Sequence, residues 1–270
     1  MIDEKDLEQF KNDLKEIEIE KNIDKPFYSF EITTTQSCNM ACKYCFEHHS
    51  DFSDTISGCS KTLDSALVIE KIDYLLDYSW FKENFKGLSI DFWGGEPTLN
   101  LDMIRTVVSH FKERPNVQFF IYSNGYKMDT FLEYLKELKK ENFDLHRFSI
   151  QFSYDGQPIH DMRRVNKNGE GTAKEVLNNA KKVIDLGYSV SFKSAIMPND
   201  FQHLPEVWED FKKIHEEFKL PEDKAQYHPT IDYCKNYETE HLENFKKAII
   251  EISKKELKYY KNKKSFLFKW

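Results

Sequence analysis

The chain has 270 residues and a formal net charge of −7 at pH 7, which argues against a broad phosphate-binding surface and makes nucleic acid a disfavoured partner. No apolar run approaches the roughly 18 residues needed to span a bilayer, and the first residues are acidic and polar where a signal peptide would be basic and then apolar. Five cysteines in so long a chain do not suggest a disulfide framework, so we expect a cytoplasmic protein without a membrane partner.

The first predicted element is a helix over residues 6–20, in which Leu7, Phe10, Leu14 and Ile17 share one apolar face. Beyond it, apolar runs typical of strands alternate with segments of helical periodicity. The predicted strands cover residues 29–34, 88–93, 117–123, 147–153, 189–196 and 226–232. The predicted helices that follow them cover residues 63–78, 101–112, 130–140, 173–186, 205–218 and 240–261.

Some predicted helix ends have a local cause. Thr172 and Glu175 have the spacing of a capping box before the helix over residues 173–186, and Gly187 is placed to close that helix. Pro205 suits the first turn of the next helix.

Repeated βα units predict an α/β fold with a parallel sheet. Six units are fewer than the eight of a complete barrel, so we expect a partial, TIM-like (βα)6 barrel. Loops at the carboxyl ends of parallel strands converge, so the functional site is expected there. We divide the chain into an N-terminal helical extension (1–25), the (βα)6 core (26–264) and a short tail (265–270).

The stretch SCNMACKYCF, directly after the first predicted strand, contains Cys38, Cys42 and Cys45. A cube of four irons and four sulfides normally takes one cysteine per iron, so three thiolates leave one iron open to a small molecule. The alternative is a structural zinc site with His48 or His49 as fourth ligand. Zinc fingers are more often built from paired CxxC knuckles, which favours the cluster.

A second motif follows the second predicted strand, where the chain reads Gly94, Gly95, Glu96 and Pro97. Two glycines permit close backbone approach to a ligand, and the acid offers an acceptor for an ammonium group. By itself a glycine pair after a strand indicates only a tight turn.

Together, CxxxCxxC with Tyr44 before its last cysteine and the strand-borne GGEP resemble the radical S-adenosylmethionine (radical SAM) superfamily. The resemblance implies a (βα)6 fold, a 4Fe-4S cluster on Cys38, Cys42 and Cys45, and SAM as cosubstrate. It implies that the amino and carboxylate groups of SAM chelate the open iron and that Gly94 to Pro97 hold the amino group. An external donor such as flavodoxin or ferredoxin would then drive cleavage of SAM to a 5′-deoxyadenosyl radical, which removes a hydrogen from substrate.

The segment from Phe152 to Asn179 is similar to the SxDGxxxxHDxxR and GxGT pattern of SPASM-type maturases, which modify peptides and proteins. That similarity implies a peptide or protein substrate and contacts of Ser153 and Arg164 with SAM. Arginine can bind a carboxylate through two parallel hydrogen bonds. The alternative is that Arg163 and Arg164 are solvated loop charges. The motif favours SAM binding over this alternative for Arg164, and Arg163 is expected to be solvated.

The resemblance also places Ser123 and Asn124 near the ribose of SAM, although Asn124-Gly125 is equally a good turn sequence. It also makes Ile196 and Met197 candidates for packing against the adenine of SAM. The alternative is that they belong to the core, as apolar residues on a barrel strand usually do. Tyr44 is expected near the cluster or the adenine.

No catalytic acid or base follows from the sequence. Side chains that we expect at the mouth of the barrel, most of them solvated or capping turns, are Asp155, Asp161, His160, His203, His228 and Tyr227.

The maturases usually continue into a cysteine-rich extension, but here only Cys59 and Cys234 remain, so auxiliary clusters are not expected. Two alternatives stay open: a radical SAM enzyme acting on a nucleotide, RNA or small metabolite, and a zinc-binding interaction module.

Overall fold

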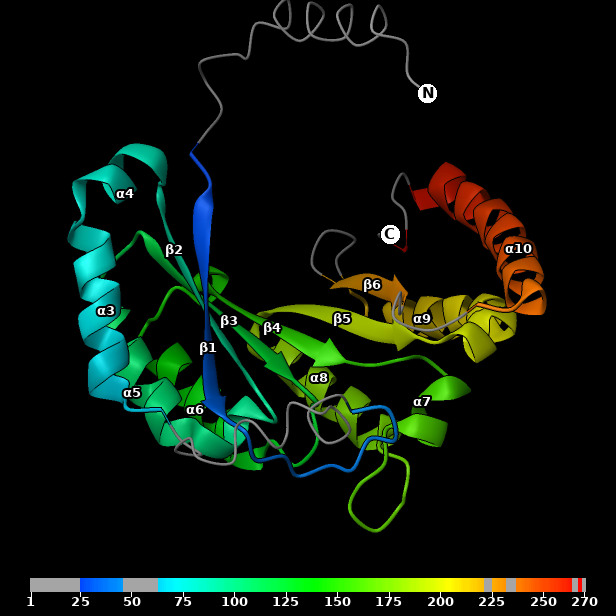
Figure 1. Ribbon diagram of the computed structural model, residues 1–270, viewed down its shortest axis with the longest axis horizontal. Helices are drawn as coiled ribbons and strands as arrows, with labels where there is room; N and C mark the ends of the chain where they lie inside the picture. The colour runs from blue at the N-terminus through cyan, green and yellow to red at the C-terminus, as the bar shows by residue number, and fades with distance from the viewer. Residues whose placement is uncertain (1–24, 46–62, 221–224, 232–236, 264–266, 269–270) are drawn as a thin grey trace, which may run out of the picture.

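The structure, a computed structural model, describes residues 25–45, 63–220, 225–231, 237–263 and 267–268. Six parallel strands form one sheet in the order β1-β2-β3-β4-β5-β6, which is also their order in the chain (Figure 1). The strands are β1 (Phe27–Thr35), β2 (Gly87–Gly94), β3 (Val117–Ser123), β4 (Phe148–Ser153), β5 (Ser189–Ile196) and β6 (Ala225–Ile231). The predicted α/β fold with a partial, open (βα)6 barrel is therefore confirmed.

The helices lie close to their predicted bounds, and two short ones were not predicted. They are α3 (Ser65–Asp77), α4 (Ser79–Asn84), α5 (Leu101–Phe111), α6 (Asp129–Lys140), α7 (Ile159–Arg163), α8 (Ala173–Leu186), α9 (Leu204–Glu217) and α10 (Thr239–Lys263), with 3-10 turns η1 (Pro97–Asn100), η2 (Leu145–Arg147) and η3 (Pro198–His203). The unpredicted ones are α4 and α7. The helix predicted over residues 6–20 lies outside the described residues. None of the described helices combines the length and the apolar character that crossing a membrane requires.

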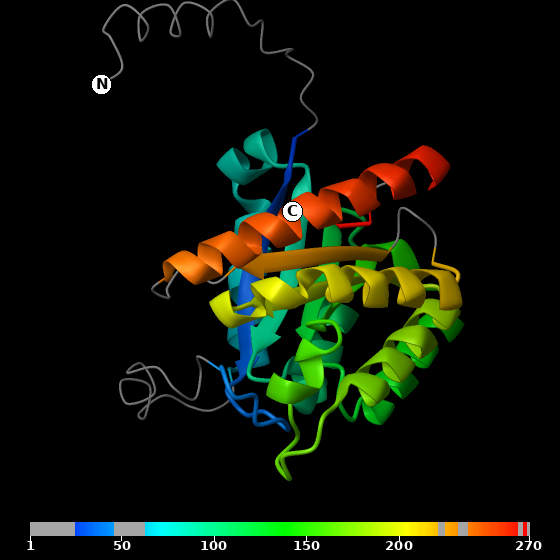
Figure 2. The same cartoon turned by 90° about the vertical axis from the view of Figure 1, so that its right-hand side faces the viewer.

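The hydrophobic core lies between the sheet and the helices that follow its outer side (Figure 1). In β3 the side chains alternate, so that Val117, Phe119 and Ile121 are buried against the helices while the residues between them are half-buried. Each helix packs one apolar face against the sheet. In α5, for example, the buried side chains include Val107 and Val108. At the end of the sheet, α9 and α10 lie alongside β6 (Figure 2).

The ends of α8 correct one prediction and confirm another. Thr172 makes no side-chain hydrogen bond to the first turn of α8, so the predicted capping box is wrong. Instead, Asp161 of α7 caps the helix: its Oδ1 accepts a hydrogen bond from the backbone N–H of Ala173 at 2.8 Å. Gly187 closes the helix as predicted, with φ +101°, a left-handed conformation that favours glycine.

The start of α9 is also as predicted. Pro205 lies in its first turn, where a missing N–H costs no intrahelical hydrogen bond.

Candidate active site

The cysteine loop, residues 36–45, follows β1 at the carboxyl end of the sheet and is held by a short backbone ladder. Its Ala41 N–H donates to Val165 O at 2.9 Å, and its Lys43 N–H donates to Arg163 O at 2.9 Å. An antiparallel bridge joins Met40 to Asn166. The loop that carries the thiols is therefore fastened to the segment that carries the two arginines, a contact that the sequence pattern did not indicate.

The three thiols of this loop are free and half-buried. Burial raises the pKa of Cys38, and it raises the pKa of Cys42 to about 11 although the positive charge of Arg164 opposes it. The backbone N–H of Cys45 donates to Cys42 O at 3.1 Å, so these two cysteines lie in one turn. Cys45 also adds to the rise in the pKa of both Cys38 and Cys42.

This donor set fits an iron–sulfur cluster. Among the described residues, no three His, Cys, Asp or Glu side chains are arranged around a single metal ion. A cubane does not require such convergence, because each thiolate binds a different iron. The loop supplies three soft sulfur donors to such a cluster. His48 and His49, the predicted alternative ligands for zinc, lie outside the described residues.

The two glycines after β2 bring that turn against the start of the cysteine loop. A Cβ at Gly94, whose φ is +138°, would lie 2.2 Å from the carbonyl oxygen of Thr35, and one at Gly95 would lie 2.6 Å from that of Ser37. The backbone N–H of Gly95 donates to Thr35 O, and that of Glu96 donates to Ser37 O, both at 2.9 Å. The close approach that these glycines allow is thus to the chain's own backbone.

Glu96 joins the end of β2 to the end of β3. Its side chain is fully buried, and its Oε1 accepts from the hydroxyls of Thr98 at 2.6 Å and Ser123 at 2.9 Å. Its Oε2 accepts from the backbone N–H of Asn124 at 2.7 Å. Burial raises the pKa of Glu96 against the opposing effect of these hydrogen bonds. A ligand ammonium would therefore meet a carboxylate that already holds two strands together.

The residues after β3 form the turn that their sequence indicates. Gly125 has φ +73°, and the backbone N–H of Tyr126 donates to Asn124 Oδ1 at 2.8 Å. The amide of Asn124 donates to Asn39 Oδ1 at 2.8 Å and contacts Cys38 Sγ at 3.6 Å. Asn39, which sequence reasoning did not select, in turn donates to Tyr126 O at 2.8 Å. The β3 turn thereby packs on the cysteine loop through side-chain amides.

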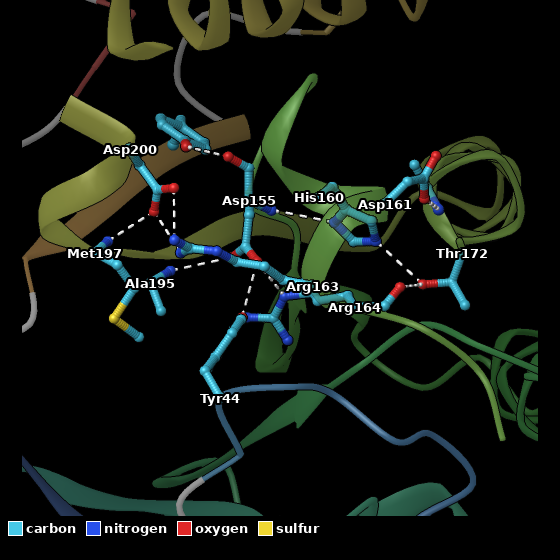
Figure 3. A network of polar contacts seen from close by, with 12 residues as sticks. Tyr44, Asp155, His160, Asp161, Arg163, Arg164, Thr172, Ala195, Met197 and Asp200 are labelled. Carbon is cyan, nitrogen blue, oxygen red and sulfur yellow. Dashed lines mark hydrogen bonds and ion pairs between the residues drawn. The ribbon is translucent and has the colours of Figure 1, made fainter. Parts of the chain in front are cut away.

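Asp155, two residues beyond the end of β4, is fully buried, and its carboxylate accepts hydrogen bonds from three elements (Figure 3). Its Oδ2 accepts from Tyr44 Oη in the cysteine loop and from Arg164 Nε, each at 2.8 Å. Its Oδ1 accepts from the backbone N–H of Ala195 in β5 at 3.1 Å. Burial, the largest single effect, would raise the pKa of Asp155, but the charge and hydrogen bond of Arg164 together with His160 and Tyr44 lower it overall.

His160 is fully buried and supports the same region from α7 (Figure 3). Its Nδ1 accepts from the backbone N–H of Asp155 at 3.2 Å, so the ring proton is on Nε2, which lies 3.1 Å from Thr172 Oγ1. The Thr172 hydroxyl donates to Arg164 O at 2.9 Å. Burial lowers the pKa of His160 to about 4, which keeps the ring neutral at pH 7.

The adjacent arginines diverge to different carboxylates. The side chain of Arg163, 16% exposed, pairs with Asp200, and its Nη2 donates to Asp200 Oδ1 at 2.6 Å. Asp200 Oδ2 also accepts from the backbone N–H of Met197 at 2.8 Å (Figure 3). The side chain of Arg164 is 11% exposed and pairs with Asp155. The interpretation of these arginines as solvated loop charges is wrong for both, because each is packed against a buried acid.

The expectation that the mouth residues are solvated or cap turns is right for Asp161, which caps α8, and wrong for Asp155 and His160, which are fully buried. Tyr227 is buried too, and its hydroxyl donates to Asp155 O at 3.3 Å. Nδ1 of His203, the last residue of η3, lies 2.9 Å from Oε2 of Glu206 in the first turn of α9.

The structure brings most of the predicted site residues together at the carboxyl edge of the sheet. They form two hydrogen-bonded groups. One joins Cys38, Glu96, Ser123 and Asn124. The other joins Tyr44 and Arg164 through Asp155. Ile196 is fully buried core, whereas Met197 is half-buried. Ser153 ends β4 opposite Lys193 of β5, and no described residue hydrogen-bonds to its side chain.

Comparison with known proteins adds three kinds of finding. The sequence profile of the Radical SAM superfamily matches residues 32–217. The radical SAM cyclopropyl synthase TigE of Paramaledivibacter caminithermalis is 26% identical over 198 residues, which cover 68% of this chain and 38% of that protein. The S-adenosylmethionine-dependent nucleotide dehydratase of Psychrobacter lutiphocae is 23% identical over 195 residues, covering 67% of this chain and 62% of that protein.

An uncharacterized protein of Methanocaldococcus jannaschii is 27% identical over 150 residues, or 54% of this chain and 45% of that protein. Among solved structures, anSMEcpe with bound AdoMet superposes with a TM-score of 0.66 at 19% identity, covering 90% of this chain and 63% of that one. The likeness to this structure concerns the fold alone. The chain spans less than two thirds of the length of each of these relatives.

Proposed function

This chain belongs to the radical SAM superfamily, and from that premise we propose that it is an enzyme that removes a hydrogen atom from a peptide or protein. The cofactors are a 4Fe-4S cluster and SAM. When bound, they supply a reductive cleavage of SAM that yields a 5′-deoxyadenosyl radical, with the electron provided by an external donor such as flavodoxin or ferredoxin. The residues of this chain bind, orient and shield these groups.

In this proposal Cys38, Cys42 and Cys45 are the protein ligands of the cluster. The observation that carries the proposal is the backbone ladder from the cysteine loop to the segment of Arg163 and Val165. It fastens the loop that carries the three thiols to the segment that carries the half-buried Arg164, at the carboxyl edge of the sheet. A fixed loop loses little conformational freedom when it takes up a cluster, which favours binding.

The same edge offers groups of both charges to the amino-acid part of SAM. Arg164 is assigned to the SAM carboxylate, since a guanidinium can donate two parallel hydrogen bonds to it. Gly94 to Pro97, with the Glu96 carboxylate, are assigned to the amino group. Glu96 keeps its position through Thr98 and Ser123, which supports a role in placing the ligand rather than in transferring protons.

The remaining assignments concern the nucleoside part of SAM. We assign Ser123 and Asn124 to the ribose, Met197 to the adenine, and Ser153 to SAM at the end of β4. Tyr44 packs near the cluster, where its hydroxyl already donates to Asp155. Asp200 supports the assignment of Met197, because it fixes the Met197 backbone from η3.

Two features support a peptide or protein as the substrate. The segment from Phe152 to Asn179 has the pattern of peptide and protein maturases, and the fold resembles that of native anSMEcpe with bound AdoMet and a peptide (TM-score 0.64, 20% identity, covering 90% of this chain and 63% of that one). The second candidate is a nucleotide substrate, which the relative named as a nucleotide dehydratase favours.

The reaction class is tested by anaerobic reconstitution with iron and sulfide, followed by incubation with SAM and dithionite. We expect formation of 5′-deoxyadenosine without any added substrate. Cys42→Ala should abolish both this product and the iron content, because a cube held by two thiolates is lost. The matched control is Cys59→Ser, which also removes one thiol and should leave both signals unchanged.

A protein that carries zinc, little iron and no brown absorbance would contradict the proposal and favour a zinc-binding module. The substrate class is tested by adding peptide or nucleotide pools to the active enzyme and following 5′-deoxyadenosine above the basal rate. Stimulation by nucleotides alone would reject the peptide assignment and leave the reaction class in place.

A further inference from the structure

We infer that Asp155 is a positioning residue for SAM, which acts by aligning Arg164 and the cysteine loop. The inference rests on the proposed function, since it takes Arg164 as the partner of the SAM carboxylate. Nothing in the sequence motif alone separates this role from that of a turn-capping aspartate. The geometry around the carboxylate does.

Asp155 is placed where three elements meet and has no exposure to solvent. Its two oxygens accept from the side chains of Tyr44 and Arg164 and from the backbone of Ala195 (Figure 3). These partners come from the cysteine loop, the end of α7 and the strand β5. A shift of Asp155 would therefore move the cysteine loop and the arginine together.

The contact to Arg164 uses only one part of its guanidinium. Nε donates to Asp155 Oδ2 at 2.8 Å, and no described residue hydrogen-bonds to either Nη group. A guanidinium is planar and rigid, so fixing Nε also fixes the direction of the Nη groups. Asp155 thus fixes the orientation of the Arg164 guanidinium and leaves both Nη groups free to donate to a ligand carboxylate.

Tyr44 couples this arrangement to the cysteine loop. Its hydroxyl donates to Asp155 Oδ2, the same oxygen that accepts the hydrogen bond from Arg164 Nε. The centre of its ring lies 5.2 Å from the Arg164 guanidinium carbon. This distance is within the range of cation–π attraction. Tyr44 directly precedes Cys45, so the last thiol of the loop is one residue from the Asp155 contact.

The backbone of Arg164 is held by a second path from Asp155. The Asp155 N–H donates to His160, His160 contacts the Thr172 hydroxyl, and that hydroxyl donates to Arg164 O. Both the side chain and the main chain of Arg164 are therefore fixed relative to Asp155. Neither path involves a surface group free to reorient, because Asp155, His160 and Thr172 are all buried.

The test is the SAM dissociation constant of the anaerobically reconstituted full chain, measured by equilibrium dialysis. Asp155→Asn keeps the shape of the side chain but removes its charge. We expect it to weaken SAM binding by about tenfold to a hundredfold, the effect of losing a hydrogen bond to a charged group. Iron per chain should stay at the wild-type level, because the backbone hydrogen bonds of Ala41 and Lys43 still hold the cysteine loop.

A double-mutant cycle separates positioning from general stabilisation. If Asp155 acts through Arg164, Asp155→Asn should weaken SAM binding in the wild-type background and have no further effect in an Arg164→Ala background. Full additivity of the two changes, or an unchanged dissociation constant for Asp155→Asn, would overturn the inference.

A second variant decides the question if Asp155→Asn does not fold. Arg164→Lys retains the positive charge but has a single ammonium, which cannot use one donor for Asp155 and a planar pair for the ligand. Wild-type SAM affinity in Arg164→Lys would overturn the inference, and a loss near that of Arg164→Ala supports it. Failure of the wild-type protein to bind SAM or iron would instead reject the proposed function itself.

Discussion

The backbone N–H of Lys43 donates to the carbonyl oxygen of Arg163 at 2.9 Å, although the two residues are far apart in the chain. This contact makes the cysteine loop one strand of a two-stranded ladder and Arg163 to Asn166 the other. The side chain of Lys43 takes no part in it and is exposed. At Lys43 the loop is thus held by main-chain groups, and a change to the Lys43 backbone should disturb it more than a change to the Lys43 side chain.

Lys43→Pro removes the donor of this hydrogen bond and should cost about 1–3 kcal/mol of loop stability. We expect fewer irons per chain after anaerobic reconstitution than in the wild type. Lys43→Ala removes the same side chain but keeps the N–H, so it should incorporate iron normally. Equal iron content in the two variants would show that the ladder does not hold the loop.

Glu96→Gln should destabilise the fold by about 1–3 kcal/mol, because one of the two carboxylate oxygens becomes an NH2 group that faces the donors of Thr98, Ser123 or Asn124. Urea unfolding at pH 7 measures the effect. Glu137→Gln is the matched control: its side chain is 49% exposed and pairs with Arg105 at the surface, so the change should stay within about 0.5 kcal/mol. Similar losses in both variants would contradict the structural role of Glu96.

Gly95→Ala and Gly169→Ala separate steric contact from backbone strain. A Cβ at Gly95 would lie 2.6 Å from Ser37 O, whereas one at Gly169 has nothing within 4 Å but sits on a residue with φ +83°. We expect Gly169→Ala to cost about 1–2 kcal/mol, the price of a left-handed non-glycine residue, and Gly95→Ala to cost more. Thermal unfolding followed by circular dichroism gives the order, and a smaller loss for Gly95→Ala would count against the tight packing of β2 on the cysteine loop.

His160 should make the stability of the fold depend on pH. Its pKa is about 4 in the folded chain and about 6.5 when unfolded, so the unfolded state binds a proton first as the pH falls. The contribution of His160 to the free energy of unfolding is therefore full above pH 6.5 and decreases toward pH 4, by up to about 3 kcal/mol. Urea unfolding between these pH values should show a shallower slope for His160→Gln than for the wild type.

The matched control for this slope is His146→Gln, which replaces an exposed histidine and leaves His160 in place. It should keep the wild-type decrease between pH 6.5 and 4. A His160→Gln variant that loses stability as steeply as the wild type would show that the buried imidazole is not the titrating group.

The sheet and its helices could be read from the sequence because each element carries its own pattern. The bounds of β3, β5 and α8 agree with those predicted, since alternating or stripe-like apolar residues mark one buried face within a single element. The end of α8 at Gly187 was predictable for the same reason, as it depends on one residue's own conformation. Local patterns were sufficient wherever local contacts decide the structure.

The site depended on contacts that local patterns do not contain. Tyr44 and Asp155 are separated by 111 residues, and nothing near either one shows that the aspartate would be buried. Thr172 has the spacing of a helix cap, but its hydroxyl donates to Arg164 O and contacts His160 Nε2, both earlier in the chain. Motif resemblance located the three cysteines and the GGEP segment, and only the packed structure showed what fixes them in place.

The order of the strands in the sheet, which is their order in the chain, has a consequence for biogenesis. Each new strand can add to the free edge left by the one before it as the polypeptide leaves the ribosome. The cysteine loop is different, because its ladder partner, Arg163 to Asn166, is translated long after Cys45. A nascent chain released before that point would have its thiols without their support, so metal delivery should follow the synthesis of α7.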